Sequence, residues 1–82
     1  MKTYLVTFEI RDGDNEYEQK GLISINGEPE DEAFISEEYG DVPYCSLNDA
    51  WDLGYGNGYP LATVSSWTEV KAEHVEILKR YL

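Results

Sequence analysis

The sequence predicts an α+β fold, a two-layer sandwich in which a three-stranded antiparallel sheet carries its helices on one face. Apolar and polar residues alternate near the N-terminus, which is typical of a half-buried strand, whereas the C-terminal residues repeat with a helical period. The predicted order is strand, strand, helix, strand, helix. A chain of 82 residues is expected to form one domain, residues 1–82, around one core.

The N-terminal hairpin is predicted by the clearest pattern in the chain. Its first strand has apolar residues at every second position: Tyr4, Val6, Phe8 and Ile10. Residues 12–15 are glycine, aspartate and asparagine, which tolerate the backbone of a tight turn. A second strand is predicted over residues 17–25, in which Gly21 indicates a bulge or the close approach of another element.

Helical structure is predicted in two places between the second and third strands. Residues 29–39 begin with Pro29 and three acidic residues, which suit the first turn and the positive end of a helix dipole. In residues 46–53, Ser46 and Asp49 stand three positions apart and resemble a capping box. Apolar residues in the same segment have helical spacing. We therefore expect a helix over 29–39 and one or two helical turns over 46–53.

The C-terminal part is predicted to contain a flexible loop, the third strand and a terminal helix. Residues 54–60 hold three glycines and a proline, a composition that excludes regular structure. Residues 61–70 form the third strand, which is expected beside the first, and a bulge at 65–66 would place Val64 and Trp67 on the core face. The terminal helix presents an apolar stripe at Val75, Leu78 and Leu82.

Negative charge is concentrated in residues 12–52, which hold thirteen acidic residues and a single base, Lys20. The whole chain has a net charge of −11. Such a charge repels bare nucleic acid and anionic lipid surfaces at long range, whereas a basic protein surface attracts it. The charge can also serve solubility alone, so both interpretations stay open at this point.

The cysteine content and the lack of long apolar segments indicate the cellular compartment of the protein. Cys45 is the only cysteine, so an internal disulfide is impossible and a reducing cytoplasm is the natural environment. The first residues lack the continuous apolar segment of a signal peptide, and no later run approaches the roughly 20 apolar residues of a membrane span. We expect a cytoplasmic protein without membrane contact.

No combination of residues predicts catalysis or a cofactor. Residues 12–18 look like a calcium loop, but Tyr17 stands where an EF-hand requires glycine and Ile23 where it requires glutamate. Cys45 and His74 are the only residues of their types and lie far apart in the sequence, so neither a nucleophile with its base nor a zinc site is expected. The sequence predicts a protein that is not an enzyme and holds no metal or cofactor.

The acidic stretch is interleaved with aromatic residues, which supply much of the contact area in protein interfaces. Alternate residues of a strand share one face, so carboxylates can stand where phosphates lie in a basic groove. We expect one binding face, built from the strand around residues 14–18 and the acids of 30–41, with tyrosines as anchors. The predicted partner-binding residues are Asp14, Glu16, Glu18, Glu30, Asp31, Glu37, Glu38, Tyr39, Asp41, Tyr55 and Tyr59.

In size, in the acidic stretch 12–52 with its one Lys20, and in order of elements, the chain resembles small acidic inhibitors of phages and mobile elements. These include anti-CRISPR and anti-restriction DNA mimics. The resemblance implies a non-enzymatic inhibitor that occupies the nucleic-acid-binding groove of a host defence complex, in the host cell cytoplasm if a phage encodes it. It assigns no role to a single residue. Two alternatives stay open. The first is a small cytoplasmic regulatory or adaptor protein that binds its partner without nucleic-acid mimicry, and the second is an enzyme or metal protein that uses Cys45, His74 or the hairpin tip of residues 12–18.

Overall fold

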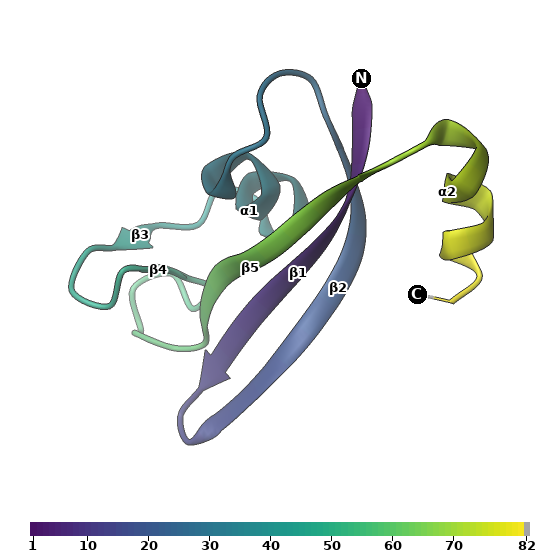
Figure 1. The fold of residues 1–82 in the computed structure, drawn as a ribbon. Coiled ribbons are helices and arrows are strands. Elements are labelled where there is room, and N and C mark those ends of the chain that lie inside the picture. Colours follow the sequence, from purple (N-terminus) through teal and green to yellow (C-terminus); the bar gives the residue numbers. More distant parts are fainter. Residues whose placement is uncertain (82) are drawn as a thin grey trace.

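The computed structural model describes residues 1–81, and Figure 1 shows how their helices and strands are arranged. Leu82, which the sequence pattern places in the stripe of the terminal helix, lies outside the described residues. Neither helix in this range has the length and apolar content needed to cross a membrane. The elements are β1 (Lys2–Asp12), β2 (Asn15–Ile25), α1 (Asp31–Tyr39), β3 (Tyr44–Cys45), β4 (Ala50–Asp52), β5 (Leu61–Val70) and α2 (Ala72–Lys79).

All the strands belong to one antiparallel sheet in the order β2-β1-β5-β4-β3. The class is α+β, as expected, but the predicted three-stranded sheet is wrong, because the sheet has five strands. The three long strands do take the predicted order, with β5 beside β1. The two additional strands, β3 and β4, come from the segment in which the sequence pattern predicts helical turns.

The β3–β4 hairpin replaces the helix predicted over residues 46–53. Asp49 has a φ of 51°, in the left-handed region, which interrupts a right-handed helix. Tyr44 and Trp51 stand opposite each other in the hairpin, with their ring centroids 5.0 Å apart. Cross-strand aromatic pairs stabilise antiparallel strands, so this pair favours the hairpin over the helix.

The core lies between the sheet and α1. Val6 and Phe8 of β1 and Phe34 of α1 have no exposed surface, and Ile35 beside Phe34 is 1% exposed. α1 therefore docks on the sheet through these two adjacent buried side chains, with the half-buried Ala33 and Tyr39 beside them. The other buried members of the core are Tyr4, Ile10, Ile23, Ile25 and Ala62.

A bulge in β5 decides which of its residues face this core. The register of β5 against β1 shifts by one residue at Ser65, which confirms the predicted bulge. Val64 and Trp67 therefore both turn toward α1, as expected. Val64 packs against the buried cluster, and the ring centroid of Trp67 lies 5.3 Å from that of Phe34.

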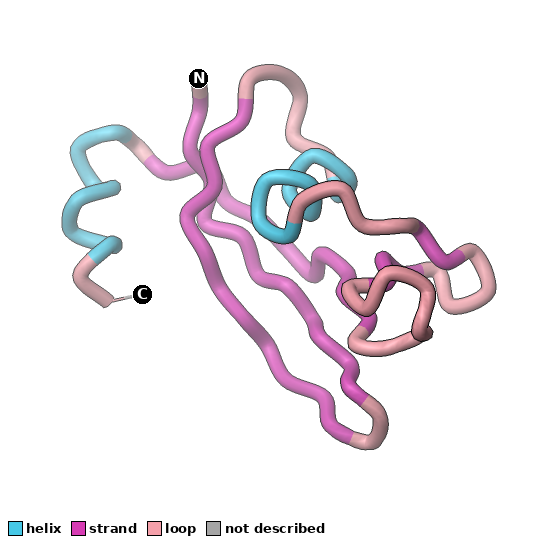
Figure 2. The backbone as a smooth tube through the Cα atoms, turned by 180° about the vertical axis from the view of Figure 1, so that it is seen from behind, coloured by secondary structure: helices cyan, strands magenta, loops and turns pink. Residues whose placement is uncertain are grey.

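The expectation that the helices share one face of the sheet is wrong, because α2 does not join α1. In both views α2 stands apart, beyond the end of β5 (Figure 2). It contains no buried residue. Ile77 and Leu78 border an open groove of about 430 Å³ with Leu5 and Val70. Leu5 alternates with the core residues of β1, so this groove lies on the side of the sheet away from α1.

Candidate functional site

The acids of residues 12–52 have no basic partner within the part of the chain that the structure describes. The charged contacts among residues 1–81 all lie outside this stretch: Lys2–Glu69, Glu73–His74 and Glu76–Lys79. The negative charge of the middle of the chain is thus not neutralised by the fold. The carboxylates that carry this charge are available to solvent or to a partner protein.

Asp52 is the exception, because it is only 5% exposed and is held by the backbone. It accepts hydrogen bonds from the N–H groups of Gly54, Gly56 and Gly58 at 2.9, 3.0 and 2.8 Å. These bonds fold the loop after β4 back over the carboxylate. A Cβ on Gly54 would collide with the carbonyl oxygen of Tyr59, so the path of the loop requires glycine there. Asp52 is a structural residue.

The structure does not bring the predicted partner-binding residues onto one face. Tyr17 pairs with the core residue Ile10 and therefore points to the α1 side of the sheet. Glu16 and Glu18 flank Tyr17 in β2, so they point to the opposite side. The acids of 30–41 lie on and beside α1. The expected continuous face is therefore wrong, because strand alternation separates its two halves.

The remaining predicted residues are spread over turns and the surface of α1. They are Asp14 in the β1–β2 turn, Glu37 and Glu38 on α1, Asp41 after α1, and Tyr55 and Tyr59 in the glycine loop, all exposed. Glu38 reaches across β2, where a Cβ on Gly21 would lie 2.9 Å from its Oε2. This contact identifies Gly21 as a site of close approach, one of its two predicted meanings.

Tyr39, predicted as an anchor for a partner, is half-buried and packs inside the molecule. Its ring lies edge-on to Phe8 with centroids 5.3 Å apart, and its hydroxyl donates to Oε1 of Gln19 at 2.7 Å. Burial, with the nearby Glu38 and Tyr17, raises the pKa of Tyr39 to about 12. Its first role is to hold the end of α1 on the sheet.

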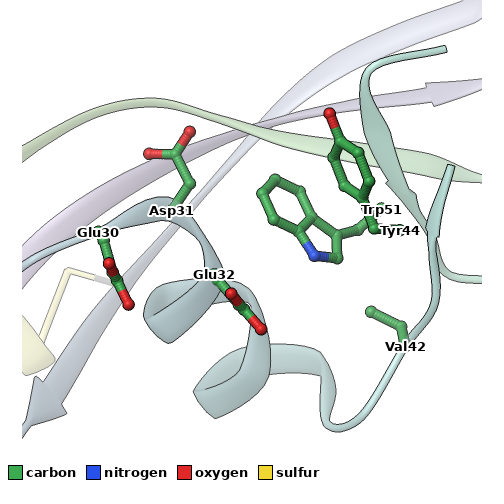
Figure 3. A pocket seen from close by; sticks show the side chains of 6 residues that line it. All are labelled: Glu30, Asp31, Glu32, Val42, Tyr44 and Trp51. Carbon is green, nitrogen blue, oxygen red and sulfur yellow. The ribbon is translucent and has the colours of Figure 1, made fainter. Parts of the chain in front are cut away.

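A cleft of about 590 Å³ opens between the start of α1 and the β3–β4 hairpin. Figure 3 shows three carboxylates on the α1 side and two aromatic rings on the hairpin side. Two separate elements thus contribute opposite walls. We refer to it as the acidic–aromatic cleft, lined by Glu30, Asp31, Glu32, Val42, Tyr44 and Trp51.

The acidic–aromatic cleft suits an organic cation. Carboxylates bind guanidinium and ammonium groups through charge-assisted hydrogen bonds, and the faces of tyrosine and tryptophan attract the same groups. The ring of Tyr44 is fixed by the hydrogen bond that its hydroxyl donates to Asp49, which also raises the pKa of Tyr44. The cleft can therefore receive a lysine or arginine side chain of another protein.

Sequence reasoning identified two of the six residues of this cleft. It selected Glu30 and Asp31 but missed Glu32, Val42, Tyr44 and Trp51. The two aromatic residues meet only because they pair across the β3–β4 hairpin. Had the residues on either side of 46–49 been interpreted as two short strands joined by a turn, the pairing of Tyr44 with Trp51 would have been predicted.

Cys45 and His74 do not form a site. Cys45 lies in β3 and His74 in α2, and these elements are on opposite sides of the molecule in both views. The Sγ of Cys45 accepts a hydrogen bond from Nδ2 of Asn48 at 3.2 Å, which lowers the pKa of the thiol. Within residues 1–81 no three His, Cys, Asp or Glu side chains are grouped so that they could hold a metal ion.

No protein-family model, no curated protein and no solved structure matches this chain. The resemblance to small acidic inhibitors stays a prediction, and function is inferred from the charge and shape of the surface.

Proposed function

We propose that this protein is a non-enzymatic inhibitor that binds the basic nucleic-acid-binding groove of a host defence complex, as anti-CRISPR proteins do. The observation that supports this most is the uncompensated charge of residues 12–52. Like charges held together in a compact domain repel one another, and a basic groove relieves that repulsion. The protein acts in the cytoplasm of the host cell in this proposal.

The α1 side of the molecule is the docking surface. α1 contains four acidic residues within nine and no base in its last turn, and Glu30 and Asp41 flank it. The other side of the sheet has mixed charge, since Arg11 stands opposite Glu16 in the register of β1 and β2 without forming an ion pair, and Lys20 alternates onto the same face. A basic groove is therefore attracted more strongly to α1.

The acidic–aromatic cleft provides the anchor within this surface. Arginine fits it better than lysine, because a planar guanidinium can stack on Trp51 or Tyr44 and still bind a carboxylate through two hydrogen bonds. Surface charge mainly accelerates association, whereas a desolvated anchor slows dissociation. In the proposed complex, the acids of α1 accelerate association and the acidic–aromatic cleft slows dissociation.

Competition with DNA tests this proposal. A guide-loaded Cas9-type nuclease and a restriction enzyme serve as partners, and release of fluorescent target DNA is measured as this protein is added. We expect release from at least one of them, with an effect that weakens as salt rises. The triple variant Glu30→Gln, Asp31→Asn, Glu32→Gln should compete about tenfold less well.

The matched control removes the same charge elsewhere, through Glu9→Gln, Glu73→Gln and Glu76→Gln. It should compete nearly as well as the natural sequence, and circular dichroism checks that both variants fold. If a complex binds this protein and its DNA at the same time, or if neither complex binds, the proposal is wrong.

The second candidate function is that of an adaptor protein, and the exposed tyrosines of the glycine loop support it. Tyr55 is 68% and Tyr59 60% exposed, and both lie in a segment without acidic residues between 53 and 60. A partner that docks there would bind with little dependence on salt. It would be sensitive to Tyr55→Ala and indifferent to the triple variant at the start of α1.

A further inference from the structure

β5 has a free edge over most of its length. β1 pairs with β5 from Leu61 to Val70, but on the other side β4 reaches only Leu61 and Ala62. Among residues 1–81, no other strand or loop supplies backbone hydrogen bonds to residues 63–70. Half of the backbone N–H and C=O groups in this part of β5 therefore point away from the sheet.

Residues 66–70 are the part of this edge most suited to pairing. They follow the bulge at Ser65, so their ladder with β1 is regular. Residues 65–69 are all exposed, and Glu69 is the only charged residue among 63–70. Trp67, at the centre, is 39% exposed while its ring rests on Phe34. A rigid, partly exposed tryptophan is a common anchor in interfaces.

The other edge of the sheet, β2, is protected. Glu16, Glu18 and Lys20 place charges along it, and Glu38 lies across it at Gly21. Charged side chains on an edge strand prevent pairing with other chains. Compared with the charged edge of β2, the part of β5 that β4 leaves uncovered is open to pairing.

We propose that residues 66–70 of β5 bind an extended segment of a partner protein as an additional strand, and that a basic side chain of this segment enters the acidic–aromatic cleft. An added strand would continue the line of β4, whose Trp51 pairs with Ala62 and lines that cleft. Ser66 is about 13 Å from Ala62 along a strand, so a few further residues of the segment reach the cleft.

The charge of this chain identifies the occupant. A second copy would bring a further −11 to an edge that already lies beside three carboxylates, which disfavours self-pairing. A basic segment is attracted by the same groups. The preference for a basic segment depends on the proposed function, whereas backbone pairing along β5 does not.

A designed peptide tests both parts. The probe alternates threonine and valine and carries an arginine at each end, so that it can bind in either direction. Amide hydrogen exchange of the full chain is followed by NMR with and without the peptide. We expect slower exchange at alternate residues within 66–70, because those N–H groups gain a partner.

Two altered peptides serve as matched controls. Methylation of all the central peptide nitrogens removes the backbone donors of both edges and should abolish binding in either direction. Glutamates in place of both arginines should weaken binding about tenfold. The triple variant Glu30→Gln, Asp31→Asn, Glu32→Gln should keep the protection at 66–70 but lose the preference for arginine.

The outcomes separate this inference from the proposed function. Unchanged exchange at 66–70 with the arginine peptide, or protection of β2 instead, overturns strand addition, and the competition with DNA is unaffected. Protection without any peptide at high protein concentration shows that a second copy is the occupant and overturns the basic segment. Equal binding of the arginine and glutamate peptides supports strand addition and contradicts the preference for a basic partner.

Discussion

α1 packs firmly against the sheet although its sequence lacks a regular apolar pattern, whereas α2 has such a pattern and stays exposed. α1 has no regular apolar stripe, yet its adjacent Phe34 and Ile35 close the core. α2 carries apolar residues one turn apart, at Val75 and Leu78, yet none of its residues is buried. The pattern of a helix therefore does not decide whether it packs.

The difference lies in what the sheet offers to each helix. At the start of α1 the ring of Phe34 meets Tyr4 at 5.4 Å and Trp67 at 5.3 Å, and at its end Tyr39 meets Phe8 at 5.3 Å. On the α2 side, the sheet lines the groove with Leu5, Thr68, Glu69 and Val70, none of which carries an aromatic ring. The bulge in β5 contributes to this, because it turns Trp67 toward α1.

Phe34→Ala should have the largest effect on this comparison. Removing a fully buried phenylalanine costs about 3–5 kcal/mol, while a domain of this size has on the order of 5 kcal/mol of stability. We expect the variant to be largely unfolded at 37 °C, as measured by circular dichroism and urea titration. Ile77→Ala in α2 is the matched control and should melt close to the natural sequence. Equal losses in the two variants would mean that α2 is packed as firmly as α1.

Asp52→Ala tests an anchor made of hydrogen bonds instead of apolar contacts. The carboxylate accepts three backbone N–H bonds, and losing such a charged acceptor should cost about 2–3 kcal/mol. Asp52→Asn keeps the shape and one oxygen, so its loss should be smaller. Urea denaturation measures both. If alanine and asparagine are equally harmless, the glycine loop does not depend on Asp52.

The titration of Tyr39 should make α1 sensitive to alkali. Its pKa rises from 10.0 to about 12 on folding, so the folded state holds this proton more tightly than the unfolded state. The resulting stabilisation is complete below pH 10 and is lost as the pH rises from 10 toward about 12. Tyr39→Phe removes this proton. Its melting temperature should fall less steeply than that of the natural sequence over this range, and parallel curves would contradict the assignment.

Removal of α2 should have the smallest effect. None of the side chains of residues 71–81 is buried, so ending the chain at Val70 should change the free energy of unfolding by about 1 kcal/mol or less. Thermal melts of the two chains measure the difference. A loss comparable to that of Phe34→Ala would show that α2 covers the open side of the sheet more closely than its exposure indicates.

The parts of the fold that follow local patterns were predictable from sequence. Alternation in β1 fixed the core side of Phe8, and the two serines before Trp67 indicated the bulge. The helix predicted over 29–39 exists as Asp31–Tyr39. In each case the pattern and the tertiary contacts favour the same structure.

The parts that depend on contacts across the chain were not predictable. Ala50 and Trp51 fit a helical spacing and a short strand equally well, and the pairing of Trp51 with Tyr44 decides between them. Nothing in the sequence of residues 54–60 indicates that Asp52 accepts hydrogen bonds from the backbone of Gly54, Gly56 and Gly58. The acids were recognised as a charged surface, but their division between two sides of the sheet required the register of β2.

The positions of the two tryptophans give the molecule a built-in optical readout. Trp51 lines the acidic–aromatic cleft, Trp67 stands on the free edge of β5, and the chain contains no other tryptophan. When light that tyrosine does not absorb is used for excitation, phenylalanine at one position leaves the other indole as the single source of emission. Fluorescence of Trp67→Phe therefore reports a cation entering the cleft, and fluorescence of Trp51→Phe reports a strand arriving at the edge. The order in which a partner occupies the two places can be followed in time without an attached dye.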